Sequence, residues 1–242
     1  DKKLSPVITV ATLLSFNNGI LTIKPQQASS YGFTLGESWL NIDLTKPQEM
    51  LNLHLLLKAK LDKNIHSLLV HYGIKIPLLQ TKGELDTNLS LAINHQTLNT
   101  TVVGKLHTPK AQINYSDKLI DVENATIEIK NSKVQIKNMK ASYQDIASSV
   151  VDFMLDGSKM DGKLVFKSNK INLKDYSAEL LPSNKPTIIT YTISKDKDYL
   201  NIDSSTWKVD GNIAKLDAIR FPISSKNSTI ELPKVGFTIQ NM

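Results

Sequence analysis

Hydrophobic and polar residues alternate with a period of two along most of the chain, and the clearest example is LNLHLLLKAKL at 51–61. The odd-numbered positions are aliphatic throughout, whereas the even-numbered positions carry Asn52, His54, Lys58 and Lys60, with Leu56 as the exception. Such alternation is typical of a strand with one apolar face and one face in water. A strand of this length spans roughly 36 Å, about twice the usual length. The pattern predicts a long half-buried strand whose apolar face has to be covered.

The same alternation recurs further along the chain. It is found in ELDTNLSLAIN at 84–94, ATIEIK at 125–130, KVQIK at 133–137, GKLVFKS at 162–168, PTIITYTI at 186–193 and VGFTI at 235–239. Hairpin turn signals separate several of these segments: Asn-Gly at 18–19 and Asp-Gly at 156–157, 161–162 and 210–211. These dipeptides tolerate the positive φ angles of tight turns. The sequence therefore predicts an antiparallel meander, with the ambiguous segment at 145–155 also read as a strand.

One segment has a helical period instead. In DKNIHSLLVHYGI at 62–74, apolar residues recur at the i, i+3, i+4 and i+7 positions, Asp62 is placed to cap the start and Gly73 to end the helix. We predict a short amphipathic helix at 62–72, followed by a link that contains Pro77. The expected organisation is one elongated segment over 1–242, with the first strands in 1–61, the helix and link in 62–80 and the strand meander in 81–242.

Composition narrows the class of protein. The 242 residues are 40% hydrophobic and 21% charged, which is typical of a folded globular chain. The sequence has no run of about 18 apolar residues, so it does not predict a membrane-spanning helix. The absence of cysteine excludes disulfides and thiolate sites. The net charge of +6 comes mostly from dispersed lysines, with Arg220 as the lone arginine. This pattern indicates a solvated lysine surface and disfavours a nucleic-acid partner.

No catalytic motif is present. There is no nucleophile elbow, no phosphate-binding glycine loop and no paired-carboxylate motif. His66 and His71 are five residues apart, which does not match the i, i+4 spacing of a helical metal site. We therefore expect a protein that is not an enzyme and that has no cofactor and no metal.

Two arrangements would cover the apolar faces of the predicted strands. A second sheet would pack on the first to make a sandwich, or one twisted sheet would curl into an apolar trough that holds a ligand. Alternation alone does not separate them. The apolar parity is mostly aliphatic, with Phe153 and Phe166 as the main central exceptions. This lining favours a trough for flexible alkyl chains.

A family resemblance points the same way. The run LDKNIHSLLVHYGIKIPLLQTKGELDTNLSLAIN at 61–94 combines the predicted helix, a Y-G-I-x-I-P-L link and the strand phrase G-x-L-x-x-x-L-x-L-x-I-N. The following run from 102 to 143 is a succession of short alternating strands. Together these features resemble the AsmA-like family of envelope proteins, most closely over about residues 50–180.

The resemblance implies a mainly β fold, in which a long antiparallel twisted sheet curls into an apolar groove (a β-taco). It also implies a periplasmic segment of a bridge between the inner and outer membranes, tethered to the inner membrane through an N-terminal helix that this chain lacks. The partners would be phospholipid acyl chains, and the two membranes or their proteins at the ends of the bridge. Two alternatives stay open: a lipopolysaccharide-carrying groove, and a structural or adhesive sandwich or solenoid without a ligand.

The lining role that the resemblance implies falls on aliphatic residues and one aromatic residue of the alternating strands. They are Leu51, Leu53, Leu55, Leu57, Leu85, Leu89, Leu91, Ile93, Ile113, Ile127, Ile129, Val134, Ile136, Leu164 and Phe166.

Overall fold

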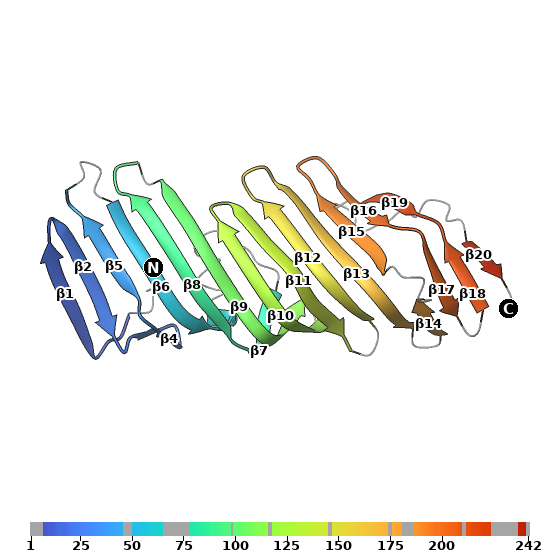
Figure 1. Cartoon of the computed structure of the whole chain (residues 1–242), viewed down its shortest axis with the longest axis horizontal. Helices are drawn as coiled ribbons and strands as arrows, with labels where there is room; N and C mark the ends of the chain where they lie inside the picture. The colour runs from blue at the N-terminus through green and yellow to red at the C-terminus, as the bar shows by residue number, and fades with distance from the viewer. Residues whose placement is uncertain are drawn as a thin grey trace. The chain divides into compact units, whose positions relative to one another are not determined.

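The chain is mainly β, as the alternation predicts, and its strands belong to one large antiparallel sheet that is not closed (Figure 1). The computed structural model describes residues 7–45, 50–64, 78–97, 99–115, 118–144, 147–173, 176–180, 186–209, 212–223 and 237–240. Within this part the chain divides into two compact units. Unit 1 comprises Asp1–Asp117 and Thr126–Asn131, and unit 2 comprises Lys118–Ala125 and Ser132–Met242.

Unit 1 is a meander with one inserted hairpin. Its strands are β1 (Ala11–Asn17), β2 (Ile20–Gln26), β3 (Ser29–Ser30), β4 (Phe33–Leu35), β5 (Trp39–Asp43), β6 (Met50–Ala59), β7 (Leu78–Gly83), β8 (Leu85–Asn94) and β9 (Thr100–Tyr115). Neighbours pair in the order β1–β2–β5–β6–β8–β9. The β3–β4 hairpin joins through β4 to β6, and β7 pairs with the far end of β9.

Unit 2 begins as a meander and then branches. Strand β10 (Lys118–Lys130) contributes residues to both units. The other strands are β11 (Lys133–Tyr143), β12 (Ala147–Asp156), β13 (Asp161–Leu173), β14 (Tyr176–Leu180), β15 (Thr187–Ile193), β16 (Asp198–Ile202), β17 (Ser205–Val209), β18 (Asn212–Leu216), β19 (Ile219–Ile223) and β20 (Phe237–Gln240). One branch runs β11–β12–β13–β15–β16–β19. The other leaves the end of β13 and runs β14–β17–β18–β20.

Turn chemistry explains several of the connections. Asn18 and Gly19 adopt φ angles of 49° and 76° between β1 and β2, which confirms the Asn-Gly turn. The first of the two neighbouring Asp-Gly pairs begins the predicted turn, because Asp156 is the last residue of β12 and Gly157 is the first residue of the turn at 157–160. The second is different, because Asp161 and Gly162 are the first residues of β13 and the turn is already complete at 157–160. The pair at 210–211 lies outside the described residues.

The predicted helix at 62–72 also lies mostly outside the described residues. Residues 63–64 have helical conformation, and the carboxylate of Asp62 accepts a hydrogen bond of 2.9 Å from the backbone N–H of Asn64. This contact matches the capping role expected for Asp62. The rest of the helix and the Pro77 link stay predictions.

Few large side chains are fully buried in the described part of the chain. The buried hydrophobic residues are Ala28, Ala111, Val122, Ala125, Val151, Ala214 and Phe221. Most of these are small, and a packed core between two sheets would instead bury its leucines and isoleucines. Among the described residues, the apolar side chains of the sheet are therefore not sealed beneath a packed second layer.

Register irregularities bend the sheet locally. Extra residues lie between Gln80 and Lys82 in β7, between Ile136 and Met139 in β11, and between Ser168 and Lys170 in β13, opposite Ser148 and Ser149. At the β11 irregularity Asn138 has a positive φ of 52°. An extra residue in one strand increases the local twist and bends that strand. These irregularities supply the physical basis for curling the sheet.

Candidate functional site

An apolar face crosses unit 1 from strand to strand, and its centre is the β6–β8 ladder. Leu53 pairs with Leu91 and Leu55 pairs with Leu89. Directly opposed residues project to the same side of a sheet. The alternation predicted at 51–61 therefore becomes a shared aliphatic surface of two long strands.

The face continues on both sides of this ladder. The residues that the register aligns with it toward β1 are Ile42 and Leu40 of β5, Leu21 and Ile23 of β2, and Phe16 and Leu14 of β1. Toward β9 they are Val102, Gly104 and Leu106. None of these was among the predicted lining residues, because their segments alternate over too few residues to fix which side they share. Only the register assigns them.

Gly104 makes room on this face. A Cβ atom at Gly104 would lie 2.7 Å from Leu89 Cδ1 and 3.8 Å from Ile129 Cβ. The missing side chain lets the flanking aliphatic groups approach each other across β9. It also places Ile129, and by alternation Ile127, on the side of Leu89.

Unit 2 has an apolar face of its own. Val134 and Ile136 of β11 pair with Leu155 and Phe153 of β12, and Phe153 pairs in turn with Leu164 of β13. The aligned positions on later strands are Phe166, Ile189, Tyr191, Ile202, Leu200, Ile219 and Phe221. Val151 pairs with Phe166 and is the largest fully buried side chain among the described residues.

All fifteen predicted lining residues are half-buried, neither sealed nor fully exposed. Fourteen lie on strands whose pairing or alternation places them on the apolar face of their own unit. Ile113 is separate, because it lies opposite Gln80 of β7 next to a register irregularity. Its lining role, like that of the others, stays a prediction.

The opposite face of unit 1 is polar. His54 Nδ1 lies 3.0 Å from Ser90 Oγ, and its ring stacks on Trp39 with centroids 5.4 Å apart. Lys58 Nζ lies 3.9 Å from Asp86 Oδ1 in an exposed ion pair, which contributes little to stability. Leu56, the exception in the alternation, lies on this side, and its backbone N–H donates to Ser38 Oγ at 2.9 Å.

On the polar face of unit 2, Asp152 holds the irregularity of β11. Its Oδ1 accepts a 2.8 Å hydrogen bond from the backbone N–H of Asn138, and its Oδ2 lies 2.6 Å from Lys167 Nζ. The Asn138 hydrogen bond, and then Lys167, lower the pKa of Asp152 below its ordinary value. This carboxylate is a structural group on the wet side of the sheet.

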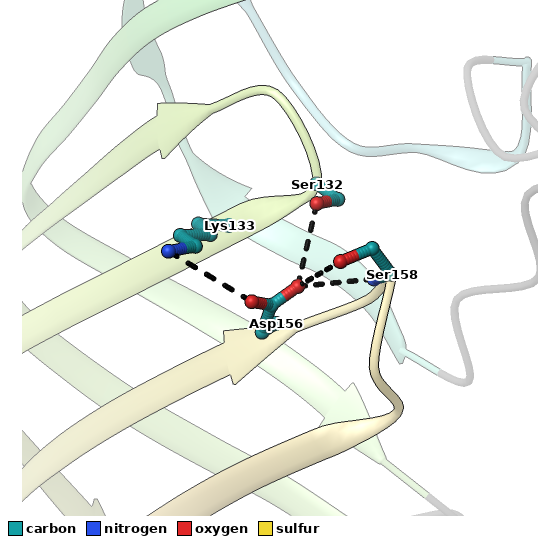
Figure 2. A network of polar contacts seen from close by, with 4 residues as sticks. All are labelled: Ser132, Lys133, Asp156 and Ser158. Atoms are coloured by element: carbon teal, nitrogen blue, oxygen red, sulfur yellow. Dashed lines mark hydrogen bonds and ion pairs between the residues drawn. The ribbon is translucent and has the colours of Figure 1, made fainter.

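Asp156 forms the polar network shown in Figure 2. Its Oδ1 accepts hydrogen bonds from Ser158 Oγ at 2.6 Å and Ser158 N at 3.1 Å, and Ser132 Oγ lies 3.4 Å away. Its Oδ2 lies 3.8 Å from Lys133 Nζ. The Ser158 hydroxyl is the main cause of a lowered pKa at Asp156. The network closes the β12–β13 turn onto the start of β11.

An open concavity of about 690 Å³ lies where β4 meets β6 in unit 1. Phe33 and Leu56 line it together with Lys58, Asp86 and His107. His107 Nδ1 lies 3.0 Å from Thr126 Oγ1. The concavity mixes apolar and charged groups and is lined mainly by residues of the polar face.

Over the residues that the structure describes, no cluster of three or more potential metal ligands occurs. His66 and His71 lie outside those residues. No helix in the same part of the chain is both long enough and apolar enough to cross a membrane.

Comparisons with family models, curated proteins and solved structures found no match to this chain.

Proposed function

We propose that the apolar face shields the acyl chains of phospholipids and that the protein binds or transfers lipid without catalysis. The observation that carries this proposal is the aliphatic surface of β5, β6, β8 and β9, whose side chains are half-buried and, in the part of the chain that the structure describes, have no second sheet over them. Soluble proteins rarely leave contiguous apolar patches larger than a few hundred Å² without a binding role. An aliphatic lining suits flexible hydrocarbon better than aromatic or polar ligands.

The energetic advantage of such a surface is large. Each methylene that moves from water to an apolar environment gains about 0.8 kcal/mol. A lipid tail held against Leu53, Leu55 and Leu91 keeps most of this gain outside the bilayer. Movement along an aliphatic strand face exchanges similar contacts at each step, so it needs no catalytic group. The phosphate headgroup would stay in water, within reach of scattered lysines.

The proposed setting comes from the AsmA-like resemblance. It is the periplasm, with the chain tethered to the inner membrane as one segment of a bridge that carries phospholipid toward the outer membrane. Partners at either end would supply direction, because the apolar face itself is indifferent to it.

Leu55 and Leu56 provide a matched test. They are adjacent, of the same type and both half-buried, yet they lie on opposite sides of β6. A photo-cross-linking amino acid at Leu55 should capture phospholipid from cells, and the same probe at Leu56 should not. Mass spectrometry of the cross-linked species identifies the adduct.

Equal capture from both positions, or none from Leu55, would contradict the proposal. The identity of the adduct separates the alternatives: lipid A would indicate a lipopolysaccharide groove, and an adduct-free protein would indicate a structural β protein. As a second readout, Leu55→Asp should abolish copurification of phospholipid while Leu56→Asp retains it. Circular dichroism of both variants checks that the sheet is intact.

A further inference from the structure

Strand β1 is an exposed edge of the sheet in unit 1. Among the described residues it pairs only with β2. All seven of its residues are exposed, and the exposed fractions of Leu13, Leu14 and Phe16 are 60%, 67% and 67%. Leu14 and Phe16 extend the apolar face, whereas Leu13 projects from the opposite side. The strand thus exposes both its backbone edge and apolar side chains.

The turn determines which backbone groups of β1 are unpaired. In a two-residue hairpin the residues that flank the turn, here Asn17 and Ile20, form a hydrogen-bonded pair, and such pairs alternate along the ladder. The N–H and C=O groups of Thr12, Leu14 and Phe16 therefore point away from β2. Pro25 lies opposite Thr12 and has no N–H to donate, which agrees with this assignment.

The edge lacks the features that usually prevent strands from pairing with other chains. Edge strands are commonly protected by charged residues, by proline or by a bulge. The sequence of β1, ATLLSFN, contains no charge and no proline, and its register with β2 is regular from Ala11 to Asn17. The backbone groups on this edge are complementary to another extended, uncharged strand.

We propose that β1 pairs with β1 of a second copy of the chain, antiparallel and about a two-fold axis at Leu14. In this register Leu14 faces its own counterpart, Thr12 faces Phe16 and Leu13 faces Ser15. Every residue of the strand is paired. This association does not depend on lipid binding.

Two features favour a second copy as the partner. In the two-fold register, even-numbered residues meet even-numbered residues, so the apolar face of one copy continues into that of the other. The strand also carries no charge, so two copies of a chain with a net charge of +6 meet along an edge where no like charges face each other. A symmetric interface of this kind is closed at two copies.

The interface is small. A single strand pair buries less than the roughly 1,600 Å² of a standard stable interface. We therefore expect a reversible dimer that dissociates on dilution. Sedimentation velocity over a concentration series of the whole chain would show this directly, and a protein that is monomeric throughout would overturn the proposal.

Site-specific disulfides test the register. The chain has no cysteine, so Leu14→Cys introduces a single thiol. Two copies of residue 14 facing each other as a hydrogen-bonded pair have Cα atoms about 5.5 Å apart, which a disulfide spans. Val103→Cys is the matched control, because Val103 is an apolar strand residue with 52% exposure that is remote from β1.

Mild oxidation should join the Leu14→Cys protein into covalent dimers at least about tenfold faster than the Val103→Cys protein, because pairing raises the effective thiol concentration. Equal rates would overturn the proposal.

Charge complementation tests whether the partner is the same strand. Leu14→Lys and Leu14→Glu should each be monomeric, because each would place like charges directly opposite each other. Mixing the two variants should restore a dimer of one copy of each. Homodimers of either variant that are as stable as those of the wild type, or a mixture that stays monomeric while wild-type protein dimerises, would overturn the self-pairing. Circular dichroism of each variant establishes that the monomer is folded.

Discussion

Two strand glycines show how closely neighbouring side chains pack on the apolar faces. At Gly104 a Cβ atom would lie 2.7 Å from Leu89 Cδ1, which is the mobile end of a side chain. At Gly162 it would lie 2.9 Å from both Leu155 Cδ1 and the backbone oxygen of Met154. A side-chain methyl moves by rotation, whereas a backbone oxygen within a ladder does not move without distorting the strand.

The two glycine-to-alanine substitutions should therefore differ. We expect Gly104→Ala to change the free energy of unfolding by less than about 1 kcal/mol, because reduced freedom of the unfolded chain offsets the crowding. Gly162→Ala should destabilise the protein by about 1–3 kcal/mol. Urea unfolding followed by circular dichroism measures both. Equal effects would show that the Met154 carbonyl does not restrict the site.

Among the elements, the β11 irregularity depends on a contact from the next strand. Asn138 adopts a left-handed conformation, and Asp152 of β12 accepts its N–H while pairing with Lys167. Both contacts favour the ionised carboxylate, so the pKa of Asp152 is lower in the folded than in the unfolded chain. The resulting stabilisation is present above the unfolded pKa, near 3.8, and is lost as the pH falls through the folded value.

The Asp152→Asn substitution should remove this pH dependence. At neutral pH the variant should unfold at lower urea concentration than the wild type, and the difference should shrink as the pH falls below about 4. Asp196→Asn, which makes the same charge change in an exposed bend, serves as the control. A difference at Asp152 that is constant from neutral to acidic pH would contradict the assigned contacts.

Alternation was sufficient to predict long strands such as β6, β8 and β13, but it did not single out β1 to β5, it left the start of β7 within the predicted link, and it did not give the arrangement of the strands. The parity of Leu51, Leu53 and Leu55 follows directly from the sequence, because one face of a long strand has to avoid water. The branch at β13 does not follow from it, since β14 and β15 both alternate acceptably and only long-range pairing decides where each lies. The irregularity at Asn138 could not be predicted from the sequence either, because asparagine is common in turns as well as in bulged strands.

The same limit applies to the candidate site. Leu85, Leu89 and Leu91 could be assigned to one face from sequence because they lie on a single strand. Leu40, Leu21 and Leu14 could not be added, because joining faces across strands requires register, and register depends on turns and insertions such as the β3–β4 hairpin. Ile113 shows the converse, because it lies at an odd-numbered position of β9, whereas the β9 residues that align with Leu89 and Leu91 are even-numbered.

For the molecule as a whole, the proposed function implies two distinct contributions to lipid binding, one hydrophobic and one electrostatic. The net charge of +6 would attract any anionic lipid surface, whereas under the proposed function the apolar face would distinguish lipids by their hydrocarbon. The electrostatic contribution is screened by salt, and the hydrophobic contribution is not. Binding of soluble single-chain lipids tests the two contributions independently.

Affinity for a homologous series of fatty acids should rise with chain length. Burial of each added methylene contributes up to about 0.8 kcal/mol, which lowers Kd by a factor of about two to four per methylene. The factor should persist at high salt, because it does not arise from the lysines. The Leu55→Asp substitution should reduce the factor gained per methylene and Leu56→Asp should not, since only Leu55 lies on the apolar face. Isothermal titration of the intact chain measures the series. Affinity that is independent of chain length but lost in salt would show that the lysine surface, and not the apolar face, holds the lipid.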